Sequence, residues 1–400
     1  MKKLLISIAL TIAVVASALL VTPSIIKGSM PEYKNSVGDK SYDQKIKGMY
    51  LLSESAKRSD NVIIYGSSEL RTDYISTHPA NFFKENYSGF QVNLVGRGSC
   101  QGIIHAFSIA ASKDSLENSK VVLITSPQSY VKGGIEPDMF MANFSKQQYI
   151  SIIYDNTISD DIKRRLSIRV SDIIERYQNE IGALSGYDDI KAIADAYKKG
   201  KTSAEALKVL MYPYLSYQKY ILDNKDMIDS QKIINEAPII KTDKISNIDW
   251  NNEYKKAEQE GKDQSLNNEF GMRDSDYKKN VGNKLSRFKD KDKNLSYSDS
   301  VEYDDLKLLL DICKEKNIKP LFVSVPLHAQ WSDYTGFTKE QRDDYYKKVE
   351  NIVKGYDCEI LNLAEYEDEK YFLCDTMHLG WKGWLRVNEK IIEFYNKDNL

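Results

Sequence analysis

Cysteine and histidine are scarce in this 400-residue chain, which has four residues of each type. The cysteines stand at positions 100, 313, 358 and 374 without CxxC spacing, so neither a disulfide-stapled scaffold nor a zinc site is indicated. The chain also lacks an excess of one charge, because 56 Lys and Arg face 58 Asp and Glu. A nucleic-acid binder needs a basic excess, so that class is excluded. The phosphate-binding motifs GxxxxGK(S/T) and GxGxxG are missing too, and no cofactor or metal is predicted.

A long hydrophobic run occurs once, near the N-terminus. Lys2 and Lys3 precede the uncharged stretch 4–21, which is just long enough to span the hydrocarbon of a bilayer. Lysines on this side favour a cytoplasmic N-terminus. Residues 1–27 are therefore predicted to form a single-pass anchor in the cell membrane, and 28–400 an extracytoplasmic domain. A cleaved signal peptide is the alternative, with a small-residue site at 16–18, but the apolar run continues past that site.

Apolar runs of strand length alternate with helical patterns along the rest of the chain. Strands that are apolar throughout are typical of a parallel sheet covered on both faces. The predicted strands are 61–65, 91–95, 121–125, 320–325 and 359–363, and the predicted helices include 103–112, 306–313, 345–353 and 383–395. We therefore predict an α/β fold, a three-layer α/β/α sandwich with a parallel sheet. The polar stretch of about 140–300 has helical periodicity and predicts a large helical insertion.

Polar side chains follow the predicted strands at their carboxyl ends, where ligands bind in such sheets. Ser68 follows the first strand, Gly98 the second and Gln128 the third, while Asp375 and His378 come after the fifth. A serine hydroxyl becomes a nucleophile when an imidazole takes its proton, and a carboxylate must orient that imidazole. Spaced three apart on a helical turn, Asp375 and His378 would share one side, which predicts a Ser–His–Asp triad. Each motif alone is more often structural, as a turn, a cap or a surface pair.

Further residues in these segments are candidates for holding the reacting groups. The oxyanion that forms during attack needs N–H donors, and the candidates are the backbone amides of Ser68 and Gly98 and the side-chain amide of Gln128. The candidates for substrate binding are Glu69, Arg97, His328, Trp331 and Trp381. A structural ion pair is the alternative for Glu69, and a hydrogen-bonded structural role is the alternative for His328.

The order of these motifs resembles the SGNH (GDSL-like) hydrolase superfamily, in which the first block carries the serine, a later block an oxyanion glycine and the last block DxxH. The chain is most similar to one branch, the D-alanyl-lipoteichoic acid biosynthesis family DltD. The segments that carry the resemblance are GSSE at 66–69, GRGS at 96–99, SPQ at 126–128, NNEFG at 267–271, WSDYTG at 331–336 and DTMHLGWKGW at 375–384. Ser67 and Gln128 depart from the superfamily, which usually has Asp and Asn there, and agree with the branch.

The resemblance implies a serine acyltransferase that acts outside the membrane and transfers D-alanine to lipoteichoic or teichoic acid through an ester on Ser68. It also implies the partners, namely the teichoic acid polymer, a D-alanyl donor and a membrane-bound O-acyltransferase with other D-alanylation components. Two alternatives stay open. The same triad would serve an esterase or thioesterase that releases acyl groups to water, and a non-catalytic adaptor would bind teichoic acid without a covalent step.

Overall fold

Five parallel strands form one sheet in the order β2-β1-β3-β4-β5. The computed structural model describes residues 2–239 and 244–397, with the side chains of 113–114 and of several positions between 2 and 18 left out. The strands are β1 Asn61–Tyr65, β2 Gln91–Val95, β3 Lys120–Thr125, β4 Leu321–Ser324 and β5 Glu359–Asn362. All five agree with the predicted strands to within one residue at either end.

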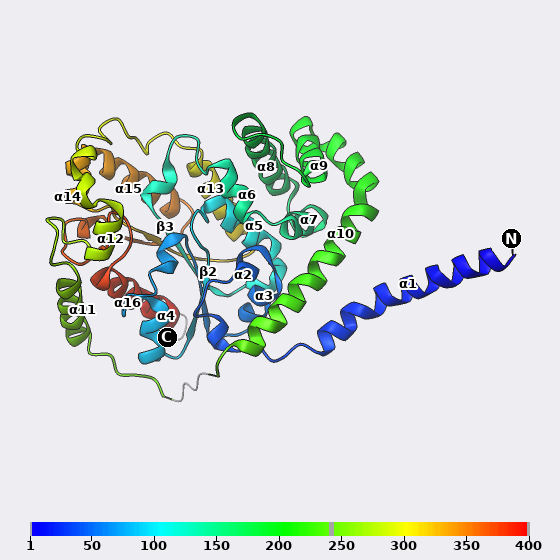
Figure 1. The fold of residues 1–400 in the computed structure, drawn as a ribbon, viewed down its shortest axis with the longest axis horizontal. Coiled ribbons are helices and arrows are strands. Elements are labelled where there is room, and N and C mark those ends of the chain that lie inside the picture. The colour runs from blue at the N-terminus through cyan, green and yellow to red at the C-terminus, as the bar shows by residue number, and fades with distance from the viewer. Residues whose placement is uncertain (1, 240–243, 398–400) are drawn as a thin grey trace.

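Helices precede, separate and follow these strands. They are α1 Lys2–Gly28, α2 Asp43–Lys47, α3 Tyr50–Ala56, α4 Pro79–Glu85, α5 Gly102–Ala111, α6 Pro137–Asn143, α7 Lys146–Tyr154, α8 Asp160–Glu180, α9 Asp188–Lys199, α10 Lys201–Glu236, α11 Trp250–Gln264, α12 Asp274–Asn280, α13 Glu302–Glu315, α14 Ala329–Thr335, α15 Lys339–Lys354 and α16 Trp381–Asn396. Between β3 and β4 the described residues form helices α6 to α13 and no strand. Helices α7 to α10 gather on one side of the molecule, and α11 and α12 on the other (Figure 1).

The sheet separates two hydrophobic cores, as the side chains of β1 show. Val62 and Ile64 belong to a core with α4, α11 and α16, whereas Ile63 and Tyr65 belong to a larger core with α5, α13 and α15. Successive side chains of a strand point to opposite faces, so a strand buried on both faces must be apolar throughout. The predicted α/β/α layering is therefore confirmed for the sheet and the helices that cover it.

Helix α1 projects away from the body, and its base is attached to the end of α10 (Figure 1). Gln231 Nε2 donates to Ser29 O at 2.7 Å, and Lys34 Nζ donates to Ala237 O at 2.8 Å. Much of the predicted anchor, 4–21, falls on residues whose side chains lie outside the described part. Within the described residues, no helix combines the length and the apolar character needed to cross a membrane. The anchor and the membrane location stay predictions.

Candidate active site

The loops after β1 and β2 lie against each other. Ser67 Oγ donates to Arg97 O at 3.4 Å. Gly96 has a φ of +148°, and a Cβ at this position would lie 1.8 Å from the Gly66 carbonyl oxygen. Only glycine permits both this backbone conformation and this close approach. The close approach of the loop after β1 (here the serine loop) to the loop after β2 (the glycine loop) therefore depends on Gly96.

Ser68, His378 and Asp375 form a chain of hydrogen bonds. Ser68 Oγ lies 2.8 Å from His378 Nε2, and His378 Nδ1 lies 2.7 Å from Asp375 Oδ2. The three residues are part-buried and come from segments 310 residues apart in the sequence. The serine follows β1, as predicted, and the carboxylate and the ring follow β5. The structure thus brings together the three side chains that the sequence singled out.

The segment that carries Asp375 and His378 is a bend rather than the helical turn that we expected from their spacing. Asp375 Oδ1 accepts the N–H groups of Met377 at 2.9 Å and His378 at 2.8 Å. An antiparallel bridge between Leu373 and Leu379 closes the bend. Such side-chain-to-backbone bonds are a turn device of Asp and compete with helix formation. They leave the other carboxylate oxygen free to reach the imidazole.

The electrostatics of the Ser68–His378–Asp375 hydrogen bonds favour a charged carboxylate and a basic imidazole. Burial lowers the pKa of His378, but the hydrogen bond and charge of Asp375 outweigh burial and raise the pKa above its ordinary 6.5. Burial raises the pKa of Asp375, but the His378 ring and two backbone amides outweigh it and bring the pKa below 3.8. A ring with a raised pKa accepts the proton of a serine hydroxyl more readily.

The predicted oxyanion donors are the backbone amides of Ser68 and Gly98 and the side chain of Gln128. Among the described residues, neither the Ser68 N–H nor the Gly98 N–H donates to a protein acceptor. Asn143 Nδ2 donates to Gly98 O at 3.2 Å, which holds the glycine loop, and a Cβ at Gly98 would meet nothing within 4 Å. Gln128 follows β3, and its buried Oε1 has no partner in the described part of the chain. In that part of the chain no hydrogen bond joins Gln128 to Ser68, and its role as a third oxyanion donor stays a prediction.

Glu69 and Arg97 make contacts inside the protein. Glu69 is 1% exposed, and its Oε1 accepts the Ser67 N–H at 2.7 Å. Burial raises the pKa of Glu69. Arg97 Nε donates to Asn143 Oδ1 at 2.7 Å, and its guanidinium pairs with Asp43. Glu69 thus holds the loop after β1, and Arg97 ties the loop after β2 to α2 and α6. Direct contact of either residue with substrate stays a prediction.

The three other predicted substrate contacts differ in their surroundings. His328 Nε2 donates to Phe270 O at 2.9 Å and its Nδ1 accepts the Trp331 N–H at 3.4 Å, so backbone groups engage both ring nitrogens. Trp381 is 0% exposed, and its prediction as a substrate contact is wrong because the first turn of α16 packs against the sheet. Trp331 is the one of the three that lines a cleft beside His378.

This cleft has a volume of about 320 Å³. Tyr277 of α12, Phe288 and Trp331 supply aromatic walls, while Asp276 and Asp292 place carboxylates in it. The sequence did not point to α12 or to Phe288, because they belong to the polar middle of the chain. In that polar middle, the nearby NNEFG segment at 267–271 was the one motif that carried the family resemblance. In the described part of the chain, no group of three or more His, Cys, Asp or Glu side chains is placed to hold a metal ion.

Comparison with known proteins identifies the family. Residues 38–396 match the family model described as DltD protein. The chain belongs to the DltD family. It is 35% identical over 350 residues to Protein DltD of Bacillus subtilis (strain 168), covering 87% of this chain and 86% of that protein. It is 27% identical over 350 residues to Protein DltD of Staphylococcus aureus (strain NCTC 8325 / PS 47), covering 87% and 84%. Membership of the DltD family implies involvement in the D-alanylation of teichoic acids.

Proposed function

We propose that this protein is a serine acyltransferase that esterifies lipoteichoic or teichoic acid with D-alanine. The observation that supports this most directly is the pair of hydrogen bonds from Ser68 Oγ to His378 Nε2, at 2.8 Å, and from His378 Nδ1 to Asp375 Oδ2, at 2.7 Å. A serine next to an oriented imidazole is the arrangement that acyl transfer through a covalent ester requires.

The first half of the reaction loads the serine. Ser68 Oγ attacks the carbonyl carbon of the D-alanyl donor while His378 Nε2 takes the hydroxyl proton, and Asp375 stabilises the imidazolium that results. The N–H groups of Ser68 and Gly98 receive the oxyanion, with Gln128 as a further candidate. The tetrahedral intermediate then expels the donor's leaving group, which takes the proton from His378. Ser68 now carries the D-alanyl ester.

The second half of the reaction transfers the acyl group. A hydroxyl of the teichoic acid polyol attacks the ester carbon while His378 takes its proton, and the Ser68 alkoxide leaves and recovers that proton. The cleft lined by Trp331, Phe288 and Tyr277 also has His378 in its wall. In this proposal the attacking hydroxyl enters through that cleft. Water entering by the same route would release free D-alanine, so the transferase must hold the polyol in the cleft and exclude water.

The location of this reaction is also part of the proposal. We place the domain outside the cell, anchored by the apolar stretch 4–21 with the N-terminus in the cytoplasm. There it would meet the polymer, and a membrane-bound O-acyltransferase with other D-alanylation components would supply the acyl donor.

The test is the D-alanine ester content of teichoic acid in cells that carry Ser68→Ala, with expression matched by immunoblot. Removing the nucleophile of such a unit costs about 10⁶-fold in rate, so the esters should be lost. Ser298→Ala, which removes an exposed hydroxyl far from the triad in sequence, is the matched control and should keep wild-type esters. Measuring free D-alanine at the same time separates transfer from hydrolysis. Unchanged esters in Ser68→Ala would contradict the proposal and favour the adaptor.

A further inference from the structure

Exposed apolar side chains gather on two neighbouring helices, α1 and α10. Among the described residues, each of these helices carries seven large apolar side chains that are exposed. Those on α10, here called the α10 patch, are Val209, Leu210, Tyr212, Tyr214, Tyr217, Ile221 and Ile228. Val209 is 76% exposed and Leu210 77%. Among the described residues, the surface helices α8 and α15 carry none, so such a cluster is not a general feature of the surface helices of this protein.

Helix α10 is apolar on its outer face as well as its inner face. Its inner face packs Leu207, Met211 and Leu215 onto the larger core. On the outside, the patch residues at 210, 214, 217 and 221 follow the spacing i, i+4, i+7 and i+11, which forms one stripe, and Ile228 lies on the same face beyond the exposed Lys225. A surface helix of a globular protein normally exposes a polar face, so this second apolar stripe indicates a contact outside the chain.

The composition of the patch fits a lipid interface. Between Glu205 and Asp223 the sequence has no acidic residue but has tyrosines at 212, 214, 217 and 220. The two lysines in this stretch pair with its flanking acids, Lys208 with Glu205 and Lys219 with Asp223, which leaves the segment without net charge. Tyrosine places an apolar ring and a polar hydroxyl at the level of lipid headgroups, and the uncharged aliphatic side chains between them enter the acyl boundary.

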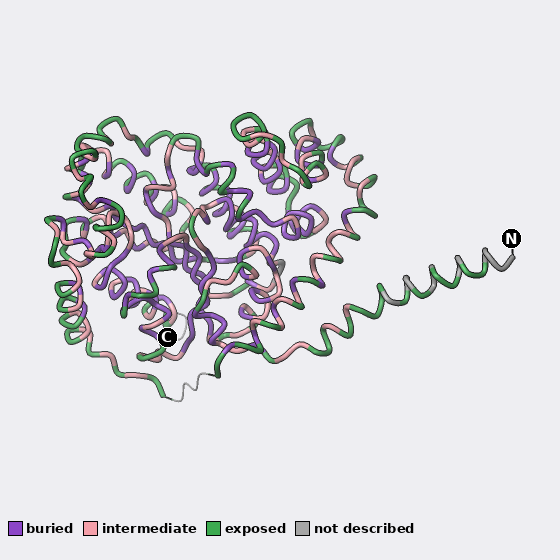
Figure 2. The backbone as a smooth tube through the Cα atoms, in the orientation of Figure 1, coloured by how far each residue is buried: buried purple, intermediate pink, exposed green. Residues whose placement is uncertain are grey.

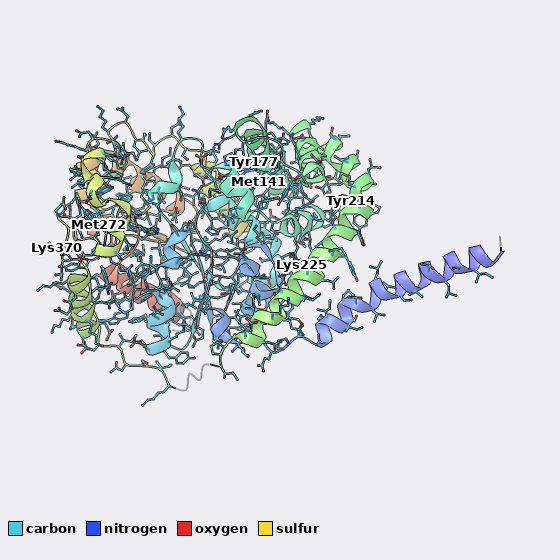
Figure 3. The ribbon with its side chains drawn as sticks, in the orientation of Figure 1. Met141, Tyr177, Tyr214, Lys225, Met272 and Lys370 are labelled. Atoms are coloured by element: carbon cyan, nitrogen blue, oxygen red, sulfur yellow. The ribbon has the colours of Figure 1, made fainter. Side chains whose placement is uncertain are left out.

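The position of α1 favours lipid over a protein partner. The base of α1 is fixed to the last turns of α10 by the Gln231–Ser29 and Lys34–Ala237 hydrogen bonds. From there α1 projects on the side of the body that α10 forms, and Figure 2 shows exposed residues along both helices. Tyr214 lies at this edge of the body, and Lys370 lies at the opposite edge (Figure 3). A bilayer that holds α1 would therefore face the α10 patch.

We infer that the α10 patch inserts into the headgroup region of the bilayer that holds α1, with lipid as its occupant. This inference rests on the membrane anchoring in the proposed function and adds a second attachment. One helix alone would let the body rotate about its base, whereas two attachments fix the orientation of the body on the membrane. In that orientation Met272, which lines the cleft beside His378, lies on the side of the body away from α1 (Figure 3).

The experiment measures lipid contact at two exposed positions of the full chain in liposomes. A nitrobenzoxadiazole fluorophore is attached to cysteine in Tyr214→Cys or, as the control, Lys370→Cys. Both carry Cys358→Ser, because Cys358 is the partly exposed cysteine and the other three are buried. Nitroxide-labelled lipids should quench the probe at 214 several-fold more strongly than the probe at 370. Adding Leu210→Glu and Tyr217→Glu should abolish that difference, whereas Leu266→Glu, at another exposed leucine, should leave it unchanged.

Flotation with the liposomes measures anchoring separately. If the chain floats and the two probes are quenched equally, the docking of α10 is overturned while the anchor stands. If the probe at 214 is shielded in detergent without lipid, and more so at higher protein concentration, a second copy covers the patch and the inference is wrong. A chain that does not float overturns both the anchor and the docking. None of these outcomes depends on Ser68, whose role is measured by the ester content.

Discussion

Replacing Asp375 by asparagine should disable the imidazole while leaving the bend intact. The asparagine carbonyl oxygen can still accept the Met377 and His378 N–H groups, which Asp375 Oδ1 now accepts at 2.9 and 2.8 Å. Its NH₂ group then takes the place of Oδ2, 2.7 Å from His378 Nδ1. A donor at this position favours the tautomer with the proton on Nε2. That ring cannot accept the proton of Ser68.

This change should affect both the reaction rate and the pKa of His378. Loss of the correct tautomer in such a unit lowers the rate by about 10⁴-fold, or about 5 kcal/mol at 1.36 kcal/mol for each tenfold. The pKa of His378 should fall as well, because burial lowers it and the charge of Asp375 is what now keeps it above 6.5. Catalysis needs the neutral ring, so activity is lost as pH falls through this pKa. In the pH–rate profile, the acid limb of the wild-type protein should therefore have its midpoint above pH 6.5. The acid limb of the residual activity in Asp375→Asn should have its midpoint below pH 6.5.

The rate at which a fluorophosphonate labels Ser68 measures both effects without the natural donor. Purified full-length protein is labelled between pH 5 and 9, a window chosen around the ordinary pKa of His378, and the adduct is followed by mass spectrometry. Asp276→Asn is the matched control, since this carboxylate lines the same cleft and contributes less to the pKa of His378. It should change the rate only a few-fold. Asp375→Asn labelled within tenfold of wild type, with an unmoved acid limb, would refute the assignment of Asp375.

Two further predictions concern stability and are measured by urea unfolding. Gly96→Ala should lower the free energy of unfolding by about 3 kcal/mol, because its Cβ would lie 1.8 Å from Gly66 O at a φ of +148°; Gly98→Ala, whose Cβ meets nothing within 4 Å, should leave it nearly unchanged. Arg342→Met should cost about 3 kcal/mol, because it removes the guanidinium 2.9 Å from the buried Glu367 carboxylate and leaves, among the described residues, only Lys339, at 3.1 Å, as a counter-charge. Equal stability of the two glycine variants, or a neutral Arg342→Met, would contradict these accounts.

The strands and the meeting of Ser68, His378 and Asp375 were predictable because their signals are local. A strand buried on both faces must be apolar over its few residues, and this pattern located all five strands. In a parallel sheet the carboxyl ends meet at one edge, so Ser68 and His378 could be expected together although 310 residues separate them. Even here the prediction of a helical turn at Asp375 was wrong. A spacing of three suits a helix, but it also suits a bend in which the carboxylate accepts two backbone N–H groups.

The sequence by itself determined the α/β class, the order of the strands along the chain and the three side chains of the candidate triad, because each depends on short-range periodicity or on position at a strand end. The tertiary structure decided which neighbouring side chains can meet a substrate. Trp381 stands six residues after Asp375 and is buried, while Trp331 lines the cleft with Tyr277 and Phe288 from the polar middle of the chain. Which face of a helix is covered depends on segments distant in sequence, and no local pattern encodes that packing.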